Sequence, residues 1–483
     1  MDTRWIAVKA QYYGLTNGIL VEERSNASAA SRDRGQLRPT IPSIALFPSP
    51  LPRRELEYIR NIQPLINELY DNVSRDYAFI RKALERVIET DEFTSQLVNI
   101  LEIVEREQLY KNKTTTFGLI RSDYMRESRP EACSSLTAMK QTEVNTVAAS
   151  TACVAERIPQ FHRFTVTLRD GFRPDNYNPE LPTPSNGKGL AEGLVSAWKQ
   201  YNSERSVIVM IVGEGEWNTY DMFHLETLLL QSYGVKVVQV IFDDVIKGGP
   251  KEAKLREDGA LIIDGHEVAI TYFRFGYSPE HYPSQKYWDV RLLFERSRSI
   301  QCPSVALHLA GTKKVQQELA TPGALERFLS NRDAVEKVQA VFLKMYALDQ
   351  TPEGDKAAAS AIADPFNYIM KPQREGGGSN LYNEDIKKTL IDLKDSVARS
   401  SYTIQDRIYP VENTNVFLKP GRLDELKQLK VVEEIGIFGT YVRTDDKFVT
   451  NSVPGHYMRV KESDMGEGCM LLGYAAIGSP WLY

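Results

Sequence analysis

The chain has 483 residues, a length that suits roughly three domains of about 150 residues each. Hydrophobic residues make up 42% and charged residues 25% of it, and with 30 glycines and 24 prolines it is neither collagen-like nor low in complexity. The 64 acidic and 59 basic side chains leave a net charge of −5, so we expect no nucleic-acid partner. The longest apolar run, Val207–Val212, is far shorter than the ~20 residues of a membrane span, so we expect no membrane partner either.

The ends and the cysteines suggest a compartment. The opening Met1-Asp-Thr-Arg-Trp5 lacks the apolar stretch of a secretory signal. Four cysteines in so long a chain, with no CxxC pair, predict neither a disulfide framework nor a zinc site. We therefore expect a cytoplasmic protein, or a secreted one if a leader peptide has been removed.

The N-terminal third is predicted to be helical. Two stripes of apolar residues recur at helical spacing and are expected to face the core. They are Ile59, Ile62, Ile66 and Leu69, and Phe93, Leu97, Ile100, Leu101 and Val104. The polar stretch 25–34 is read as a connector, and the Pro- and Asn-rich stretch 173–187 as a domain junction.

The next part of the chain alternates predicted strands and helices. The apolar strand Val207–Val212, a helix over 220–232 and a strand over 235–242 predict a βαβ unit in a parallel sheet. Strands over 261–264 and 267–273 flank an Asp-Gly turn and predict a hairpin. The segment 204–311 is therefore expected to form an α/β module. Beyond it the pattern predicts helices over 324–348 and a strand over 368–370.

The strongest chemical signal is the segment from Lys371 to Tyr382. Three adjacent glycines let backbone N–H groups close around a polyanion. Lys371 adds a positive charge, and Glu375 has the oxygen donors that hold a divalent cation. A flexible surface turn is the alternative. The spacing matches neither a P-loop nor a dinucleotide fingerprint.

Other segments carry weaker signals. On a strand, Glu143 and Asn145 would project to one face, where their oxygens suit Mg²⁺, although a solvated strand face gives the same pattern. Arg274 at the end of a strand suits bidentate binding of a carboxylate, or a surface ion pair. The basic pairs Lys313-Lys314 and Arg459/Lys461 are, taken alone, typical of a solvated surface.

Five motifs in this order make the chain resemble the eukaryotic glutathione synthetase family of ATP-grasp ligases nearly from end to end. They are Arg121-Ser-Asp-Tyr-Met125, Glu143-Val-Asn145, Leu309-Ala-Gly-Thr-Lys-Lys-Val-Gln-Gln-Glu-Leu319, Lys371-Pro-Gln-Arg-Glu-Gly-Gly-Gly378 and Gly436-Ile-Phe-Gly-Thr-Tyr-Val-Arg443. The resemblance implies an α/β ATP-grasp fold and a homodimer. It divides the chain into an ATP-grasp part (1–203 and 312–483, with the glycine-rich loop and the lid) and an inserted parallel-sheet substrate-binding domain (204–311).

The resemblance also implies roles for individual residues, with ATP as co-substrate and two Mg²⁺ ions per active site. The metal ligands would be Glu143, Asn145 and Glu375. The ATP-binding residues would be Glu143, Lys313, Lys371, Gly376, Gly377, Tyr382, Asp406, Arg407, Ile408, Glu434 and Lys461. The substrate-binding residues would be Arg121, Ser150, Glu216, Asn218, Arg274, Tyr277 and Arg459, of which Arg121 and Arg459 would be catalytic.

The implied activity is ligation of γ-glutamylcysteine to glycine through an acyl phosphate. Several positions depart from the family pattern: Ala148 replaces a serine, Met222 a glutamine and Phe275 an aspartate, and the lid has Cys469, Met470 and Leu471 where the family has small residues. These changes leave two alternatives open. One is a ligase with a different acceptor amino acid, and the other is a secreted paralogue with little or no ligase activity.

Overall fold

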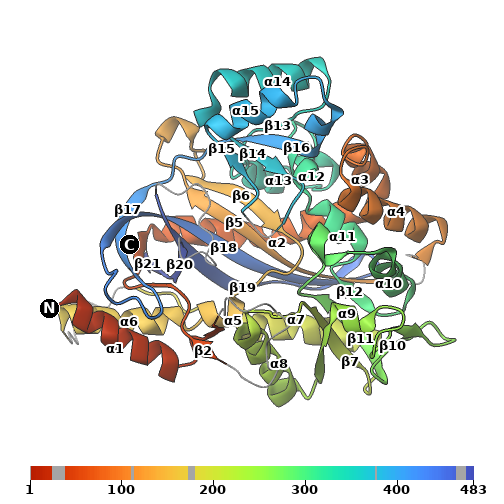
Figure 1. Cartoon of the computed structure of the whole chain (residues 1–483), viewed down its shortest axis with the longest axis horizontal. Coiled ribbons are helices and arrows are strands. Elements are labelled where there is room, and N and C mark those ends of the chain that lie inside the picture. The colour runs from red at the N-terminus through yellow and green to blue at the C-terminus, as the bar shows by residue number, and fades with distance from the viewer. Residues whose placement is uncertain (1, 24–37, 110–113, 172–179, 376–377, 464–474) are drawn as a thin grey trace.

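The structure is a computed structural model that describes residues 2–23, 38–109, 114–171, 180–375, 378–463 and 475–483. In these ranges the strands form three larger sheets with helices packed against them (Figure 1), so the predicted α/β class is confirmed. The helices are α1 (Thr3–Thr16), α2 (Arg53–Arg75), α3 (Tyr77–Leu84), α4 (Glu92–Arg106), α5 (Ala152–Ala155), α6 (Ile158–Asp170), α7 (Asn186–Tyr201), α8 (Thr219–Tyr233), α9 (Phe242–Val245), α10 (Gln285–Arg296), α11 (Val305–Ala310), α12 (Lys313–Leu319), α13 (Arg332–Gln339), α14 (Pro352–Ala363) and α15 (Glu384–Asp392). None of the helices in these ranges is both long enough and apolar enough to cross a bilayer.

The central sheet has seven strands in the order β17-β3-β20-β19-β18-β5-β6. They are β3 (Ile44–Ala45), β5 (Thr115–Arg126), β6 (Met139–Asn145), β17 (Glu412–Leu418), β18 (Gln428–Thr444), β19 (Lys447–Glu462) and β20 (Ala475–Gly478). All neighbours are antiparallel except β20 and β3. Two further sheets have two strands each: β1 (Val21–Glu22) pairs with β2 (Pro39–Thr40), and β4 (Ser49–Leu51) pairs with β21 (Pro480–Leu482).

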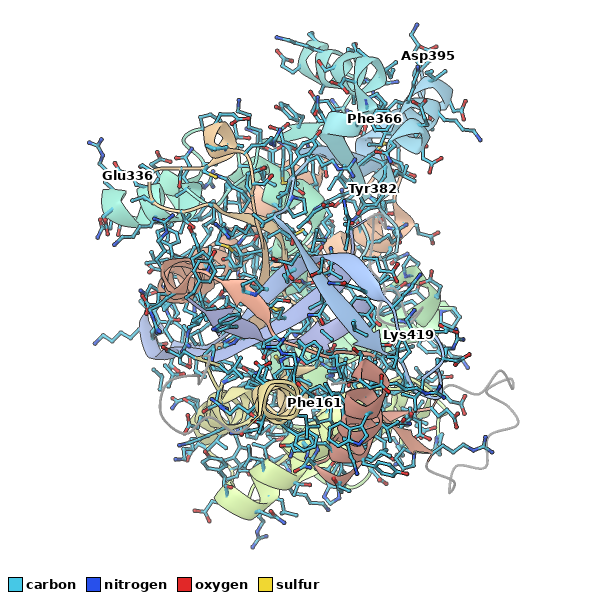
Figure 2. All side chains as sticks on the ribbon, turned by 90° about the vertical axis from the view of Figure 1, so that its left-hand side faces the viewer. Phe161, Glu336, Phe366, Tyr382, Asp395 and Lys419 are labelled. Atoms are coloured by element: carbon cyan, nitrogen blue, oxygen red, sulfur yellow. The ribbon has the colours of Figure 1, made fainter. Side chains whose placement is uncertain are left out.

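Helices cover both faces of this sheet. A Cβ added to Gly439 of β18 would lie 2.0 Å from Asn67 Oδ1 of α2, whereas a Cβ added to Gly193 of α7 would lie 2.9 Å from Thr440 Cβ. Because successive strand residues point to opposite faces, α2 and α7 pack on opposite sides of β18. The apolar stripes predicted on α2 and α4 are buried. Figure 2 shows Phe161 of α6 within the molecule, whereas Glu336 and Asp395 lie at its surface.

The second sheet is built from the segment predicted to form an α/β module. Its strands are β7 (Val207–Val212), β8 (Val237–Ile241), β9 (Lys254–Leu255), β10 (Leu261–Ile263), β11 (His266–Phe273) and β12 (Ile300–Cys302). β8, β7, β11 and β12 run parallel, and α8 connects β7 to β8, which confirms the predicted βαβ unit. The predicted hairpin is also confirmed, since Asp264 and Gly265 have φ angles of 50° and 75°, as a type I′ turn requires.

The third sheet is antiparallel, in the order β13-β16-β14-β15, and packs with α14 and α15 at the top of Figure 1. Its strands are β13 (Met345–Ala347), β14 (Tyr368–Pro372), β15 (Leu381–Tyr382) and β16 (Tyr402–Asp406). The prediction of helices over 324–348 is wrong in part. The 3-10 helix Leu325–Arg327 and α13 form there, but residues 345–347 pair with β16, and this pairing overrides their local preference.

Candidate active site

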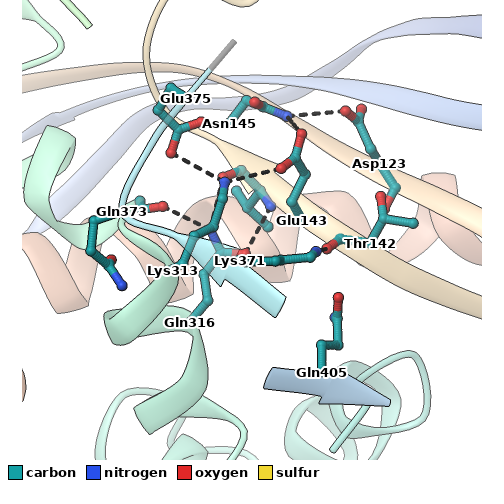
Figure 3. A network of polar contacts seen from close by, with 12 residues as sticks. Asp123, Thr142, Glu143, Asn145, Lys313, Gln316, Lys371, Gln373, Glu375 and Gln405 are labelled. Atoms are coloured by element: carbon teal, nitrogen blue, oxygen red, sulfur yellow. Dashed lines mark hydrogen bonds and ion pairs between the residues drawn. The ribbon is translucent and has the colours of Figure 1, made fainter. Parts of the chain in front are cut away.

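A buried ammonium group lies between two carboxylates where β6, α12 and the end of β14 meet (Figure 3). Lys313, the first residue of α12, is 3% exposed. Its Nζ lies 3.0 Å from Glu143 Oε2 and 3.2 Å from Glu375 Oε1. Lys371 of β14 reaches the same region and donates from Nζ to the main-chain oxygen of Thr142, at 2.7 Å. Residues 232 positions apart in the sequence thus share one ionic cluster.

The charged groups of this cluster shift one another's pKa values. Burial tends to raise the pKa of Glu143, but Lys313 and Lys371 together hold it below its usual range. Burial, aided by Glu143, raises the pKa of Glu375 to about 7 even though Lys313 opposes the shift. Burial favours the neutral form of Lys313, yet the two carboxylates hold its pKa above the usual value. The cluster therefore favours a positive charge at its centre.

Glu143 and Asn145 do project to one face of β6, as predicted. Asn145 Nδ2 donates to Glu143 Oε1 at 3.3 Å and to Asp123 Oδ2 at 3.0 Å. Asp123 lies on β5 directly opposite Glu143 and is fully buried. Arg121, two residues earlier on the same face, holds Asp123 with two hydrogen bonds of 2.7 Å. Asp123 was not predicted, because its acidic neighbours become visible only once the strand register is known.

These residues are chemically suited to a divalent cation. The side-chain oxygens of Glu143, Asn145 and Glu375 are hard donors of the kind Mg²⁺ prefers. The ammonium of Lys313 already lies between the two carboxylates, which shows that a cation fits there. Within the described ranges no cluster of three or more His, Cys, Asp or Glu side chains forms a metal site. The predicted set has only two such residues, so the remaining ligands would come from phosphate and water.

A second ionic cluster spans β18 and β19. Glu434 and Arg459 are direct cross-strand partners and form an ion pair. Lys461 Nζ lies 2.8 Å from Glu434 Oε2. Burial opposes ionisation of Glu434, but Arg459 and Lys461 lower its pKa to about 2. Three residues predicted to contact nucleotide and substrate are thus held together before either ligand is bound.

Arg274 presents part of its guanidinium group without a protein partner. It follows β11, and its main-chain N–H donates to Ile211 O at 2.9 Å, which anchors it to β7. Nη1 donates to Ala149 O at 2.5 Å, and the side chain is 6% exposed. Nε has no hydrogen-bond partner among the described residues. A nearly buried guanidinium with a free edge is suited to binding a carboxylate.

The loop that carries Ser150 is held by α8. Ser150 lies between Ala148 and Thr151, whose φ angles are 53° and 72°. Asp221 of α8 accepts the main-chain N–H groups of Thr151 and Val154, both at 3.0 Å. Just before α8, Asn218 N donates to Glu216 Oε1 at 2.9 Å. Asp221 was another residue that the sequence did not reveal, because its partners are main-chain groups of a distant loop.

The predicted nucleoside end follows β16. Burial raises the pKa of Asp406. Arg407 N donates to Asn367 O at 2.8 Å, and Arg407 Nη1 donates to Asn383 Oδ1 at 2.8 Å. Ile408 is 6% exposed. This segment is therefore fixed by hydrogen bonds to the loops around β14 and β15.

Every predicted site residue that the structure describes lines one cavity of about 480 Å³. They are Arg121, Glu143, Asn145, Ser150, Glu216, Asn218, Arg274, Tyr277, Lys313, Lys371, Glu375, Tyr382, Asp406, Arg407, Ile408, Glu434, Arg459 and Lys461. Gly376, Gly377, Cys469, Met470 and Leu471 lie outside the described residues. A second cavity of about 1040 Å³, between α3, α4 and β12, shares none of these described residues.

The three departures in the substrate half have separate structural settings. Met222 is 3% exposed and belongs to the apolar cluster that contains Ala149 and Val212. Ala148 lies in the left-handed region at the turn before Ser150. Phe275 lines the cavity and stacks on His281, with ring centroids 3.5 Å apart.

Comparison with known families shows the family to which the chain belongs. The family described as "Eukaryotic glutathione synthase, ATP binding domain" matches residues 2–482. The chain therefore belongs to the eukaryotic glutathione synthase family.

Its relatives include enzymes from animals and plants. Glutathione synthetase from Bos taurus is 39% identical over 441 residues, covering 90% of this chain and 89% of that protein. Glutathione synthetase from Homo sapiens is 38% identical, with the same coverage of both chains. A chloroplastic glutathione synthetase from Arabidopsis thaliana is 34% identical, covering 91% of this chain and 78% of that protein.

A solved structure supports the fold independently. A glutathione synthetase-like effector from Globodera pallida, in its apo form, superimposes with a TM-score of 0.75. The match covers 100% of this chain and 98% of that chain at 21% sequence identity. At that identity the likeness is evidence for the shared architecture alone.

Proposed function

We propose that the protein is an ATP- and Mg²⁺-dependent ligase that joins γ-glutamylcysteine to glycine. The cysteinyl carboxylate attacks the γ-phosphorus of ATP, and ADP leaves. The glycine amine then attacks the acyl carbon, phosphate leaves, and the amine loses a proton as the peptide bond forms. A carboxylate is a poor electrophile, so the phosphate supplies the leaving group that it lacks.

One observation carries this proposal: every described candidate residue lines the same cavity, which holds the two ionic clusters as well as Arg274. These residues include some on strands of the central and third sheets and some on the segments that follow β7 and β11 of the second. The cavity contains charged groups for binding and neutralisation, which is what phosphoryl and acyl transfer by positioning requires.

At the ATP end, Lys313 and Lys371 neutralise phosphate oxygens, and Glu143, Asn145 and Glu375 hold Mg²⁺. When bound, Mg²⁺ supplies charge neutralisation to the same phosphate oxygens. The segment 406–408 and Tyr382 bind the base, and Glu434 and Lys461 the rest of the nucleoside. The proximity of both ionic clusters supports this assignment.

At the substrate end, Arg274 binds a carboxylate of γ-glutamylcysteine through its free edge. Ser150, Glu216, Asn218 and Tyr277 line the surrounding wall. Arg121 lines the same cavity, with its guanidinium carbon 4.8 Å from the ring centroid of Tyr457, and binds the reacting carboxylate. Arg459 faces the acceptor carboxylate. Both arginines are held by acidic partners, which orients them before the substrates bind.

Several finer properties belong to this proposal. They are the ATP-grasp fold, domain boundaries after residues 203 and 311, two Mg²⁺ ions per site, a homodimer and a cytosolic location. Cys133, Cys153 and Cys302 are free thiols, which is compatible with a reducing compartment. Light scattering tests the homodimer, and subcellular fractionation tests the location.

Release of ADP tests the function. The purified protein is incubated with ATP, MgCl₂ and γ-glutamylcysteine, and with glycine, β-alanine or serine as acceptor. We expect turnover with glycine that stops when MgCl₂ is replaced by EDTA. Turnover with β-alanine or serine but not with glycine would assign a different acceptor to the enzyme. ATP binding without turnover on any acceptor would overturn the ligase assignment.

A paired substitution tests the lid. Reverting Met470 to Val and Leu471 to Ala restores the small residues of the family pattern, so glycine approaches the backbone more closely. We expect kcat/KM for glycine to rise while KM for ATP is unchanged. An unchanged kcat/KM would show that Met470 and Leu471 do not determine which acceptor the enzyme uses.

A further inference from the structure

Two aromatic residues of the substrate half are joined by a histidine that does not itself line the described cavity. Phe275 and Tyr277 both line the cavity. His281 stacks on Phe275 with ring centroids 3.5 Å apart and planes inclined by 24°. It also meets the ring of Tyr277 edge-on, at 4.8 Å and 84°. One imidazole therefore contacts both aromatic side chains.

The same histidine fixes the backbone between them. His281 Nδ1 accepts the main-chain N–H of Gly276 at 3.0 Å. Gly276 has a φ of 89°, and its carbonyl oxygen accepts the hydroxyl of Tyr282 at 3.0 Å. Both main-chain polar groups of this one residue are thus bound by side chains five and six residues later. The turn begins directly after Arg274, whose own main-chain N–H donates to Ile211 O.

The ring of Phe275 also packs against Gly213 and Phe242. A Cβ added to Gly213, at the end of β7, would lie 2.5 Å from Phe275 Cδ2 and Cε2. The ring can lie there only because residue 213 is a glycine. Phe242, which is fully buried, meets Phe275 edge-on at 6.3 Å. The ring is therefore held between Gly213, His281 and Phe242.

We propose that His281 is a positioning residue for the donor dipeptide, holding Phe275 and Tyr277 as an aromatic wall that receives the cysteinyl side chain while Arg274 receives a carboxylate. This inference rests on the proposed function, since it names γ-glutamylcysteine as the donor. The wall bears no charge, so it suits the apolar part of the donor. A thiol gains favourable contact with an aromatic ring that a hydroxyl of similar shape lacks.

The chemistry of His281 suits a constant structural role. Burial lowers its pKa to about 4, although Glu280 opposes the shift. The ring is therefore neutral near neutral pH, and Nδ1 stays available as an acceptor. Three substitutions separate its two contacts. His281→Asn keeps an acceptor near Nδ1 without the ring, His281→Phe keeps the ring without the acceptor, and His281→Ala removes both.

Donor binding without ATP or acceptor is the test, because it does not depend on ligation. Isothermal titration with γ-glutamylcysteine is expected to give a Kd raised about tenfold in His281→Ala, with the Asn and Phe variants in between. Titration with ATP is expected to change by less than about twofold, since the contacts of His281 described above are with Phe275, Gly276 and Tyr277. His266→Ala, at the far end of β11, is the matched control and should leave both affinities unchanged.

Selectivity gives the second readout. The wild-type protein is expected to bind γ-glutamylcysteine about fivefold more tightly than γ-glutamylserine. Phe275→Asp should abolish this preference, and Phe275→Leu should keep part of it. An unchanged preference in Phe275→Asp, or an equal loss of donor and ATP affinity in His281→Ala, would overturn the inference. A wild-type protein that binds the donor selectively but does not turn over would leave the wall in place and remove only the ligase function.

Discussion

Arg274→Lys is the sharpest test of how the substrate half works. The substitution keeps the positive charge but replaces a planar group that has five N–H donors with a single ammonium. In the structure Nη1 is engaged by Ala149 O, and Nε is without a partner among the described residues. The edge formed by Nε and Nη2 is therefore what remains for a substrate carboxylate.

The expected loss follows from that geometry. A bidentate arginine makes two charge-assisted hydrogen bonds to a carboxylate, and lysine in the same place makes one. A hydrogen bond to a charged group contributes about 1.5–3 kcal/mol. At about 1.4 kcal/mol per factor of ten, the Kd for γ-glutamylcysteine should rise by about 10- to 150-fold. Arg274→Gln should lose more, because the charge is removed as well.

The assay is isothermal titration with γ-glutamylcysteine and, separately, with ATP. Arg256→Lys is the matched control, since Arg256 lies in the same module and pairs with Asp258 and Glu267 on an exposed surface. The control should change neither affinity. If Arg274→Lys bound the donor as tightly as the wild type, or if ATP binding fell by the same factor, the proposed carboxylate contact would be refuted.

Three further predictions concern other parts of the site and the sheet behind it. Lys371→Ala should weaken ATP binding at least about tenfold and γ-glutamylcysteine binding by less than about twofold in titrations, and equal losses would contradict its role. Gly436→Ala places a Cβ 2.5 Å from Tyr457 Cε1 and 2.6 Å from Asp123 Oδ1, so both the melting temperature and kcat measured by ADP release should fall; an unchanged kcat would argue against Asp123 as the support of Arg121. Burial raises the pKa of Glu433 to about 7 although Asn413 opposes it, so the folded protein binds the extra proton between the usual pKa and 7, and its stability falls as pH rises through that window. Glu433→Gln should therefore stabilise the protein more at pH 8 than at pH 5, with a difference of up to about 3 kcal/mol in the free energy of unfolding. Melting temperatures at the two pH values test this, and an equal shift at both would show that Glu433 does not titrate in that window.

The elements that could be predicted from the sequence are those whose pattern is local. Val207–Val212 is apolar throughout because both faces of β7 are covered, and the Asp264-Gly265 turn has backbone angles that few other residue pairs adopt. Residues 345–347 could not be predicted in the same way. Their strand exists because β16, almost sixty residues later, provides its hydrogen bonds.

The residues of the candidate site also differ in whether a local pattern could predict them. Glu143 and Asn145 could be placed on one face because the alternation of a strand decides it. Asp123, Asp221 and His281 could not be found, because each acts through groups that are distant in the sequence or belong to the main chain. The departure at Phe275 was visible, but its stacking partner became apparent only in the folded turn.

The arrangement of charges also explains how charged side chains can line the cavity when it is empty and still bind polyanions there. Lys313 is paired with Glu143 and Glu375, so the buried ammonium and the two partly buried carboxylates satisfy one another without ligands. When a nucleotide and its cation enter, the ammonium can turn to phosphate and the carboxylates to the cation, and each group exchanges one opposite charge for another. The cost of removing these charges from water has then been met during folding, and binding adds no unpaired charge to the interior. Replacing Lys313 by Met should therefore harm the empty protein as well as ATP binding, because two facing carboxylates would lose their shared partner. A lower melting temperature without ligand, together with weaker ATP binding, is the expected result, and a variant that lost ATP affinity with an unchanged melting temperature would show that the ion pairs do not stabilise the fold.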